Sequence, residues 1–278
     1  MATPTLSHHT LPGALGPILI DVRAASRNAP QPAVLIMHGF KGFKDYAFLP
    51  QIAERLARAG FTAVNFSVSG SGVDEHGEFT GPERFARNTY TREMGDIGLV
   101  VRALLAGELG VVPPTSIGMI GHSRGGGVAL CVVRETPEIT ALVTWAAIST
   151  IRRYPDEVVE MWRRLGRIEV ENVRTQQKLP MDYEIVEDAL ANADRFDIAK
   201  AAQTLDRPWL LVHGTEDETI PLAEGRELAA SAAPSHTEAL FIEGASHTFG
   251  ARHPWQGHTK ETEQLFGATV LFLSRHLR

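Results

Sequence analysis

Residues 117–133 read IGMIGHSRGGGVALCVV and give the clearest indication of the fold. An aliphatic run over residues 117–120 leads directly into Gly121-His122-Ser123-Arg124-Gly125, and an apolar run with helical character follows. The order strand, glycine-flanked turn, helix matches the pattern G-x-S-x-G, whose serine is held in strained backbone geometry that lifts its hydroxyl clear of a sheet. We therefore predict that Ser123 is a nucleophile. The alternative is a tight glycine-rich turn without a chemical role.

On either side of this stretch, short β-branched or aliphatic runs alternate with longer amphipathic ones. Strands are expected at residues 18–23, 33–38, 63–68, 117–121, 141–148, 209–213 and 239–243. Helices are expected over residues 46–59, ending at Gly60 in a left-handed cap, and over residues 92–105. This alternation predicts an α/β fold with a mostly parallel central sheet flanked by helices on both faces.

Residues 149–205 interrupt this alternation with a polar segment dotted with aromatic side chains. A structureless loop of that length is improbable inside a compact domain, so the segment is expected to have its own helix and a short hairpin. We predict one domain over residues 1–278, with residues 149–205 as an inserted cap. Insertions of this kind usually lie over a site.

Composition and charge exclude several classes of protein. Of the 278 residues, 44% are hydrophobic and 22% charged, which is ordinary globular usage and excludes collagen-like and low-complexity chains. The net charge is −6 and no block of Lys or Arg is present, so nucleic acid is not an expected partner.

The cysteine content, the apolar runs and the histidine spacing indicate where the protein is located and whether it binds a metal. Cys131 is the only cysteine, which rules out an intramolecular disulfide and a cysteine-rich zinc site and fits a reducing compartment. The first 16 residues lack the features of a signal peptide, and no apolar run approaches the roughly 20 residues that span a bilayer. No histidine pair has metal-binding spacing with a carboxylate. We expect a cytoplasmic protein with no membrane partner, no metal and no cofactor.

A serine hydroxyl is a weak nucleophile at neutral pH, so Ser123 needs a histidine base and a carboxylate to orient that base. Asp217 lies in the loop after the strand candidate at residues 209–213, and it is our candidate acid. Its neighbours Glu216 and Glu218 can compete for the role, and an acidic solvated loop or a helix N-cap is the other interpretation. Thirty residues later, His247 follows the strand candidate at residues 239–243 and is our candidate base.

The chain has eleven histidines, so the choice of His247 needs comparison with the others. His253 and His258 lie in the same loop and are the main competitors for the base. His38 and His213 end strand candidates just before a glycine, and structural roles are favoured for both. His122 is the variable residue of the turn and is expected to pack or hydrogen-bond locally.

The oxyanion that forms when a carbonyl is attacked needs backbone N–H donors already aimed at it. One candidate is the amide of Arg124, the residue after the nucleophile and the first of the expected helix. The second is the amide of Phe40, in the loop after the strand candidate at residues 33–38. A plain hydrophobic lid residue is the alternative for Phe40.

The combined motifs resemble the α/β-hydrolase superfamily over nearly the whole chain. HGFKGFKD at residues 38–45, HSRGG at residues 122–126 and HGTEDETIP at residues 213–221, with Ser246-His247, are similar to the dienelactone hydrolase-like and prolyl oligopeptidase-like branch. Within it, the chain resembles bacterial cinnamoyl or feruloyl esterases, which also carry an inserted cap before the strand of the catalytic acid. Dienelactone hydrolases proper use cysteine, from which Ser123 departs, and the short HGF loop argues against the hormone-sensitive lipase branch.

This resemblance implies a serine carboxylesterase that acts through an acyl-enzyme on a small-molecule ester, with hydroxycinnamoyl esters as one candidate class. The cap aromatics Tyr154, Trp162, Tyr183 and Phe196 can line an acyl pocket or simply bury the cap against the core. An acyl-aminopeptidase or a thioesterase with the same triad stays open. A ligand-binding protein on a hydrolase scaffold also stays open, because a fold hosts many functions. The sequence leaves a homodimer open as well.

Overall fold

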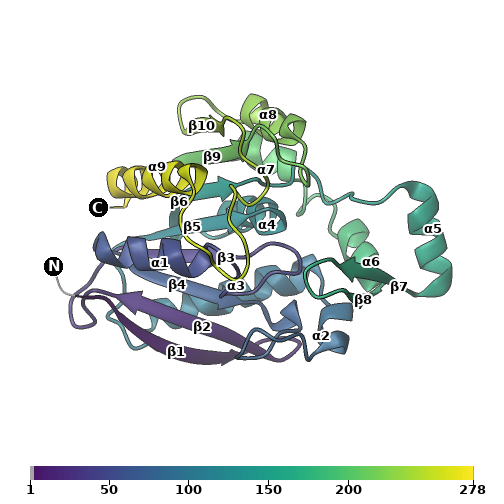
Figure 1. Ribbon diagram of the computed structural model, residues 1–278, viewed down its shortest axis with the longest axis horizontal. Helices are drawn as coiled ribbons and strands as arrows, with labels where there is room; N and C mark the ends of the chain where they lie inside the picture. The colour runs from purple at the N-terminus through teal and green to yellow at the C-terminus, as the bar shows by residue number, and fades with distance from the viewer. Residues whose placement is uncertain (1–2, 278) are drawn as a thin grey trace.

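The computed structural model describes residues 3–277, which form an eight-stranded central sheet in the order β1-β2-β4-β3-β5-β6-β9-β10 (Figure 1). Its strands are β1 (Thr5–Pro12), β2 (Pro17–Ala24), β3 (Ala33–Met37), β4 (Thr62–Ser67), β5 (Ile117–His122), β6 (Ile139–Trp145), β9 (Trp209–Gly214) and β10 (Thr237–Ile242). The pairs β1·β2 and β2·β4 are antiparallel, whereas β4·β3, β3·β5, β5·β6, β6·β9 and β9·β10 are parallel. The predicted α/β class is confirmed.

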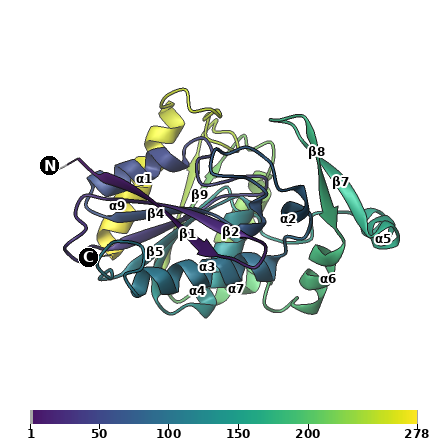
Figure 2. The same cartoon turned by 90° about the horizontal axis from the view of Figure 1, so that it is seen from below.

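Helices cover both faces of the sheet, as Figure 2 shows for α1 and α9 on one side and α3, α4 and α7 on the other. The helices apart from α5 and α6 are α1 (Leu49–Arg58), α2 (Pro82–Ala86), α3 (Tyr90–Leu105), α4 (Arg124–Glu135), α7 (Ile198–Thr204), α8 (Leu222–Ser231) and α9 (Lys260–His276), with a 3₁₀ turn at Ser69–Ser71. Apolar residues of α3, α4, α7 and α8 belong to one core, and those of α1 and α9 to a second core across the sheet. α1 buries one apolar stripe, whereas α4 is buried on all sides from Arg124 to Val133, and this packing is the main source of helix stability.

Two strand predictions differ from the structure. β1 was not predicted, because its sequence TLSHHTLP has few aliphatic residues and it is a half-exposed edge strand that pairs only with β2. The strand expected at residues 141–148 runs instead from Ile139 to Trp145. It ends there because Ala146 adopts a positive φ of 48°, which leaves the extended conformation.

The segment between β6 and β9 contains α5 (Asp156–Leu165), β7 (Arg167–Asn172), β8 (Gln177–Asp182) and α6 (Glu184–Ala191) ahead of α7. β7 and β8 form a separate antiparallel hairpin. Figure 1 shows α5 and this hairpin at the end of the molecule opposite α9. Arg167 in β7 binds Glu83 of α2 through two hydrogen bonds of 2.9 and 2.8 Å, which ties the hairpin to the rest of the chain.

Across residues 3–277, no helix combines the length and the hydropathy that crossing a bilayer requires.

Candidate active site

Ser123 lies at the turn between β5 and α4 and has φ 57° and ψ −122°, a backbone conformation that residues other than glycine rarely adopt. The turn is so tight that a Cβ atom at Gly121 would lie 2.4 Å from the carbonyl oxygen of Gly125. A Cβ atom at Gly125 would lie 2.3 Å from the carbonyl oxygen of His38. Both positions therefore require glycine, and the strand, turn and helix predicted around Ser123 are confirmed.

Asp217 and His247 form a close pair at the carboxyl edge of the sheet. Asp217 follows β9 and His247 follows β10, and these neighbouring parallel strands deliver both loops to the same edge. Nδ1 of His247 lies 2.9 Å from Oδ2 of Asp217, while Oδ1 accepts hydrogen bonds from the amides of Thr219 (2.9 Å) and Ile220 (2.8 Å).

The charge of Asp217 depends on these partners. Burial alone would raise the pKa of this carboxyl, but the hydrogen bond and the charge interaction with His247 and the two amide donors lower it below its ordinary value. Asp217 is therefore an ionised acceptor that holds the proton of His247 on Nδ1. Its neighbour Glu216 is exposed, and Glu218 accepts a hydrogen bond of 3.2 Å from the backbone amide of His247.

His247 lies directly beside the turn that carries Ser123. Its ring centroid is 4.7 Å from that of His122, the residue before Ser123, and Nε2 of His122 donates a hydrogen bond of 3.1 Å to the carbonyl oxygen of His247. Among the hydrogen bonds of residues 3–277, none joins the Ser123 hydroxyl to His247. Catalytic hydrogen bonds are often long without substrate and tighten when it binds.

The two competing loop histidines are held elsewhere. Nδ1 of His253 accepts a hydrogen bond of 3.1 Å from the amide of Ala47. Nδ1 of His258 lies 2.6 Å from a carboxylate oxygen of Glu263 in α9. The structure brings only His247 of these three histidines into contact with Asp217.

Three buried histidines surround the turn. Burial lowers the pKa of His38 to about 4 and the pKa of His122 to about 3. His213 is fully buried and donates from Nε2 to the carbonyl oxygen of Ile220 at 2.9 Å, which braces the loop that carries Asp217. His38 and His122 are thus neutral at pH 7.

The amides of Phe40 and Arg124 are free to donate. Within the described chain, neither backbone N–H makes a hydrogen bond to a protein acceptor. Arg124 is the first residue of α4, and the first amides of a helix have no partner inside the helix. Both residues line the cavity next to Ser123.

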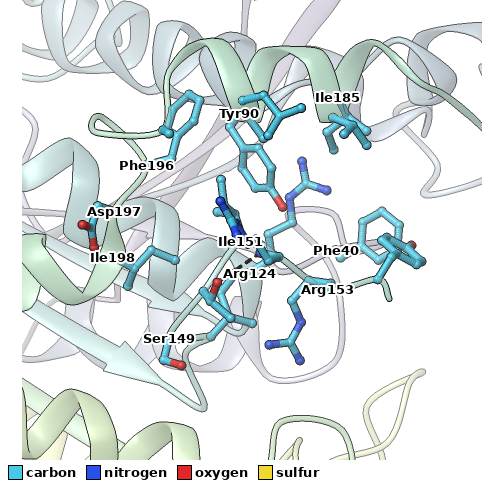
Figure 3. Close-up of a pocket in the computed structure, with 18 of the residues that line it drawn as sticks. Phe40, Tyr90, Arg124, Ser149, Ile151, Arg153, Ile185, Phe196, Asp197 and Ile198 are labelled. Carbon is cyan, nitrogen blue, oxygen red and sulfur yellow. Dashed lines mark hydrogen bonds between the residues drawn. The ribbon is translucent and has the colours of Figure 1, made fainter. Parts of the chain in front are cut away.

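This cavity has a volume of about 750 Å³ and is lined by Ser123 and by residues of the segment that follows β6. Figure 3 shows Ser149, Ile151 and Arg153 of that segment at the cavity. Tyr154 and Trp162 line it, as the sequence suggested for cap aromatics. Tyr183 does not line it in the described structure. The prediction for Tyr183 needs correction, because its ring packs against Trp162, 6.2 Å away, and belongs to the packing of α5 on the hairpin.

Several lining residues had no signal in the sequence. Tyr90, at the start of α3, and Arg153, after β6, both face the cavity in Figure 3. The side chain of Arg124 also lines it, although only its amide was predicted to matter. No local motif marks these side chains, because the folding of distant segments brings them together.

Comparison with known proteins gives a family match and more distant relatives. The family model described as serine aminopeptidase, S33, matches residues 28–192, a stretch that contains Ser123 and ends before Asp217 and His247. The chain is 24% identical to 2,6-dihydropseudooxynicotine hydrolase of Paenarthrobacter nicotinovorans, over 80% of this chain and 54% of that protein. It is 35% identical to the pimeloyl-[acyl-carrier protein] methyl ester esterase of Xanthomonas campestris pv. campestris over 28% of each chain. The chain thus spans about half of one curated relative and about a quarter of the other.

A solved structure shows the same fold. Est1E from Butyrivibrio proteoclasticus, determined with ferulic acid bound, superimposes with a TM-score of 0.67 over 94% of this chain and 95% of that chain, at 19% sequence identity.

Proposed function

Because the chain belongs to the serine aminopeptidase S33 family and is an α/β hydrolase, we propose that it is a serine carboxylesterase that cleaves small carboxylic esters. One observation carries the proposal. The pair of Asp217 and His247, 2.9 Å apart, stands beside the strained turn that presents Ser123 to a cavity of about 750 Å³. Acyl transfer needs a nucleophile, a base that takes its proton and an acid that orients the base.

In the first half of the reaction, the Ser123 hydroxyl attacks the ester carbonyl and Nε2 of His247 takes the hydroxyl proton. Asp217 keeps the other imidazole proton on Nδ1, so that Nε2 is free to act as the base. The amides of Phe40 and Arg124 donate hydrogen bonds to the oxyanion. His247 then protonates the departing alcohol, and the acyl group stays on Ser123.

In the second half, water replaces the alcohol. His247 takes a proton from the water, which attacks the acyl carbonyl, and the same two amides stabilise the second oxyanion. Collapse of this intermediate returns the proton from His247 to Ser123 and releases the carboxylic acid. The protein ends in its starting state, and no cofactor takes part.

Hydroxycinnamoyl esters are one acyl class that we propose for this cavity. Tyr154 and Trp162 line it, with their ring centroids 5.3 Å apart, so this part of the cavity wall is aromatic and can pack against an aromatic acyl group. The likeness in fold to Est1E, whose structure holds ferulic acid, agrees with this class.

Peptide hydrolysis is the second candidate, because the family description names a serine aminopeptidase. The same three residues can cleave an amide, as in an acyl-aminopeptidase, or a thioester, as in a thioesterase. The cytoplasmic location stays a prediction, and so does the homodimer that the sequence left open.

The test is a panel of initial rates for wild type and Ser123→Ala. The substrates are p-nitrophenyl acetate, butyrate and octanoate, methyl ferulate, an acyl-alanine p-nitroanilide and a butyryl thioester. We expect ester turnover by wild type that is lost in Ser123→Ala, with far-UV circular dichroism unchanged. Ester hydrolysis that persists in Ser123→Ala would refute the mechanism. Preference for the anilide would identify a peptidase.

A further inference from the structure

The side chain of Arg124 is a buried cation in the wall of the cavity. It follows Ser123 directly, is only 8% exposed and lines the same space (Figure 3). The catalytic steps above use only its backbone amide. The guanidinium therefore needs a separate explanation, because a charge is seldom buried without one.

The guanidinium has fewer partners than donors. Its Nη2 lies 2.9 Å from a carboxylate oxygen of Glu93, and its Cζ stands 4.4 Å from the ring centroid of Tyr90 and 5.3 Å from that of Phe40. Arginine carries five N–H groups, and Glu93 is the only acceptor in contact with them among residues 3–277. Nε and Nη2 are both buried without a hydrogen-bond partner, so the contact of Nη2 with Glu93 is an ion pair that lacks hydrogen-bond geometry. Buried polar groups are normally paired, so the site is incomplete without a ligand or water.

The charge of the site indicates which ligand completes it. Glu93, 4% exposed, already balances the charge of Arg124, and Glu224 holds the cavity residue Arg153 at 2.7 and 2.8 Å. The whole cavity is lined by three arginines and four acids: Arg124, Arg152, Arg153, Asp156, Asp194, Asp197 and Glu227. A carboxylate on the substrate would have to compete with Glu93 inside a cavity that is not cationic. A neutral oxygen can accept from Arg124 without disturbing the pair.

We propose that Arg124 determines specificity by donating N–H to a neutral carbonyl or hydroxyl oxygen that the ester carries close to its reacting carbonyl. We expect this oxygen to lie close to the reacting carbonyl, because the amide proposed to bind the oxyanion and the guanidinium belong to the same residue, which lines the cavity beside Ser123. The favoured substrates are esters of oxo or hydroxy acids, or of oxo or hydroxy alcohols. This inference rests on the proposed esterase function.

The test uses matched esters that differ in one oxygen. Ethyl 3-oxobutanoate is compared with ethyl butanoate for an acceptor on the acyl side, and 2-oxopropyl butanoate with propyl butanoate for the alcohol side. Ethyl hydrogen succinate against ethyl 4-methylpentanoate reports on an anionic group. The measured quantity is the kcat/KM ratio within each pair, which cancels any loss common to both esters.

Wild type is compared with the double variant Arg124→Met/Glu93→Gln. Both charges are removed together, because Arg124→Met alone would leave the Glu93 carboxylate buried and without a cation. The matched control is Glu93→Gln, whose amide oxygen can still accept the 2.7 Å hydrogen bond from Nδ2 of Asn88 and which keeps the guanidinium. Thermal unfolding followed by circular dichroism establishes that each variant is folded. Should the double variant not fold, Arg124→Lys is measured in its place.

We expect the double variant to lower the oxo-to-plain ratio by about 10- to 100-fold in one of the first two pairs, because a hydrogen bond from a charged donor is lost. The pair that changes locates the acceptor on the acyl or the alcohol side. Glu93→Gln should keep the wild-type ratio, and Arg124→Lys should lower it at least threefold. Unchanged ratios in both pairs, an equal loss in Glu93→Gln, or a change confined to the succinate pair would overturn the inference. Absence of ester hydrolysis by wild type would instead contradict the proposed function.

Discussion

Replacing Asp217 with Asn tests whether the carboxylate sets the tautomer of His247. Oδ1 of Asp217 accepts from the amides of Thr219 and Ile220, and Oδ2 faces Nδ1 of His247. An asparagine has one acceptor oxygen, and the two backbone donors will orient it toward themselves. Its NH₂ group then faces Nδ1 of His247, which must become the acceptor. The imidazole proton moves to Nε2, where it blocks the uptake of a proton from Ser123.

The expected loss is large because the wrong tautomer cannot act as a base. We expect kcat/KM for p-nitrophenyl butyrate at pH 7.5 to fall by about 10⁴-fold, equivalent to about 5.5 kcal/mol in the activation free energy. The matched control is Glu216→Gln, which neutralises the exposed acid next in the chain and should keep activity within about twofold of wild type. Thermal unfolding checks that both variants are folded.

Two results would refute this reasoning. If folded Asp217→Asn kept more than a tenth of the wild-type activity, the carboxylate would not be setting the tautomer of the base. If Glu216→Gln lost as much activity as Asp217→Asn, the effect would come from the charge of the loop and not from the contact between Asp217 and His247.

Four further variants test predictions about stability. Gly125→Ala should lower the free energy of unfolding by about 1–3 kcal/mol, because its Cβ would lie 2.3 Å from the His38 carbonyl oxygen. Gly95→Ala, on an open face of α3, should raise the free energy of unfolding by about 0.5–1 kcal/mol. Urea unfolding measures both glycine variants, and equal effects of the two would contradict the packing argument. Because burial lowers the pKa of His38 from 6.5 to about 4, the unfolded chain binds more protons between these values, so stability should fall as the pH falls, by about 1.4 kcal/mol per pH unit from this residue. Urea unfolding at several pH values should show a shallower slope for His38→Asn, and an unchanged slope would exclude this contribution. Trp162→Phe should lower the free energy of unfolding by about 1–3 kcal/mol, since the buried carbonyl of Met181 loses the indole N–H at 3.0 Å; an unchanged melting temperature would argue against it.

The sequence predicted those strands well that are buried on both faces of the sheet. Strands β3, β5 and β9 are buried throughout, and their aliphatic runs stand out from the helices between them. The edge strand β1 alternates between exposed and half-buried residues and carries polar side chains, so its pairing with β2 had no comparable local signal. The end of β6 depends on the positive φ of Ala146, and alanine does not signal this conformation.

The parts of the candidate site that depend on chain order and local conformation could be predicted from the residues alone. The turn at Ser123 is local, because Gly121 and Gly125 leave room for the backbone that surrounds it. The loops of Asp217 and His247 follow neighbouring parallel strands, so their meeting at one edge of the sheet follows from the order of the strands.

The shape and chemistry of the cavity, in contrast, depend on contacts between distant segments of the folded chain. The contact of Arg124 with Glu93, and the rings of Tyr90 and Phe40 beside it, join segments that no periodicity relates. The same holds for Tyr183, whose place behind Trp162 depends on how α5 packs against the hairpin. Burial and side-chain direction arise from packing between distant segments, and this information is not contained in any short stretch of the sequence.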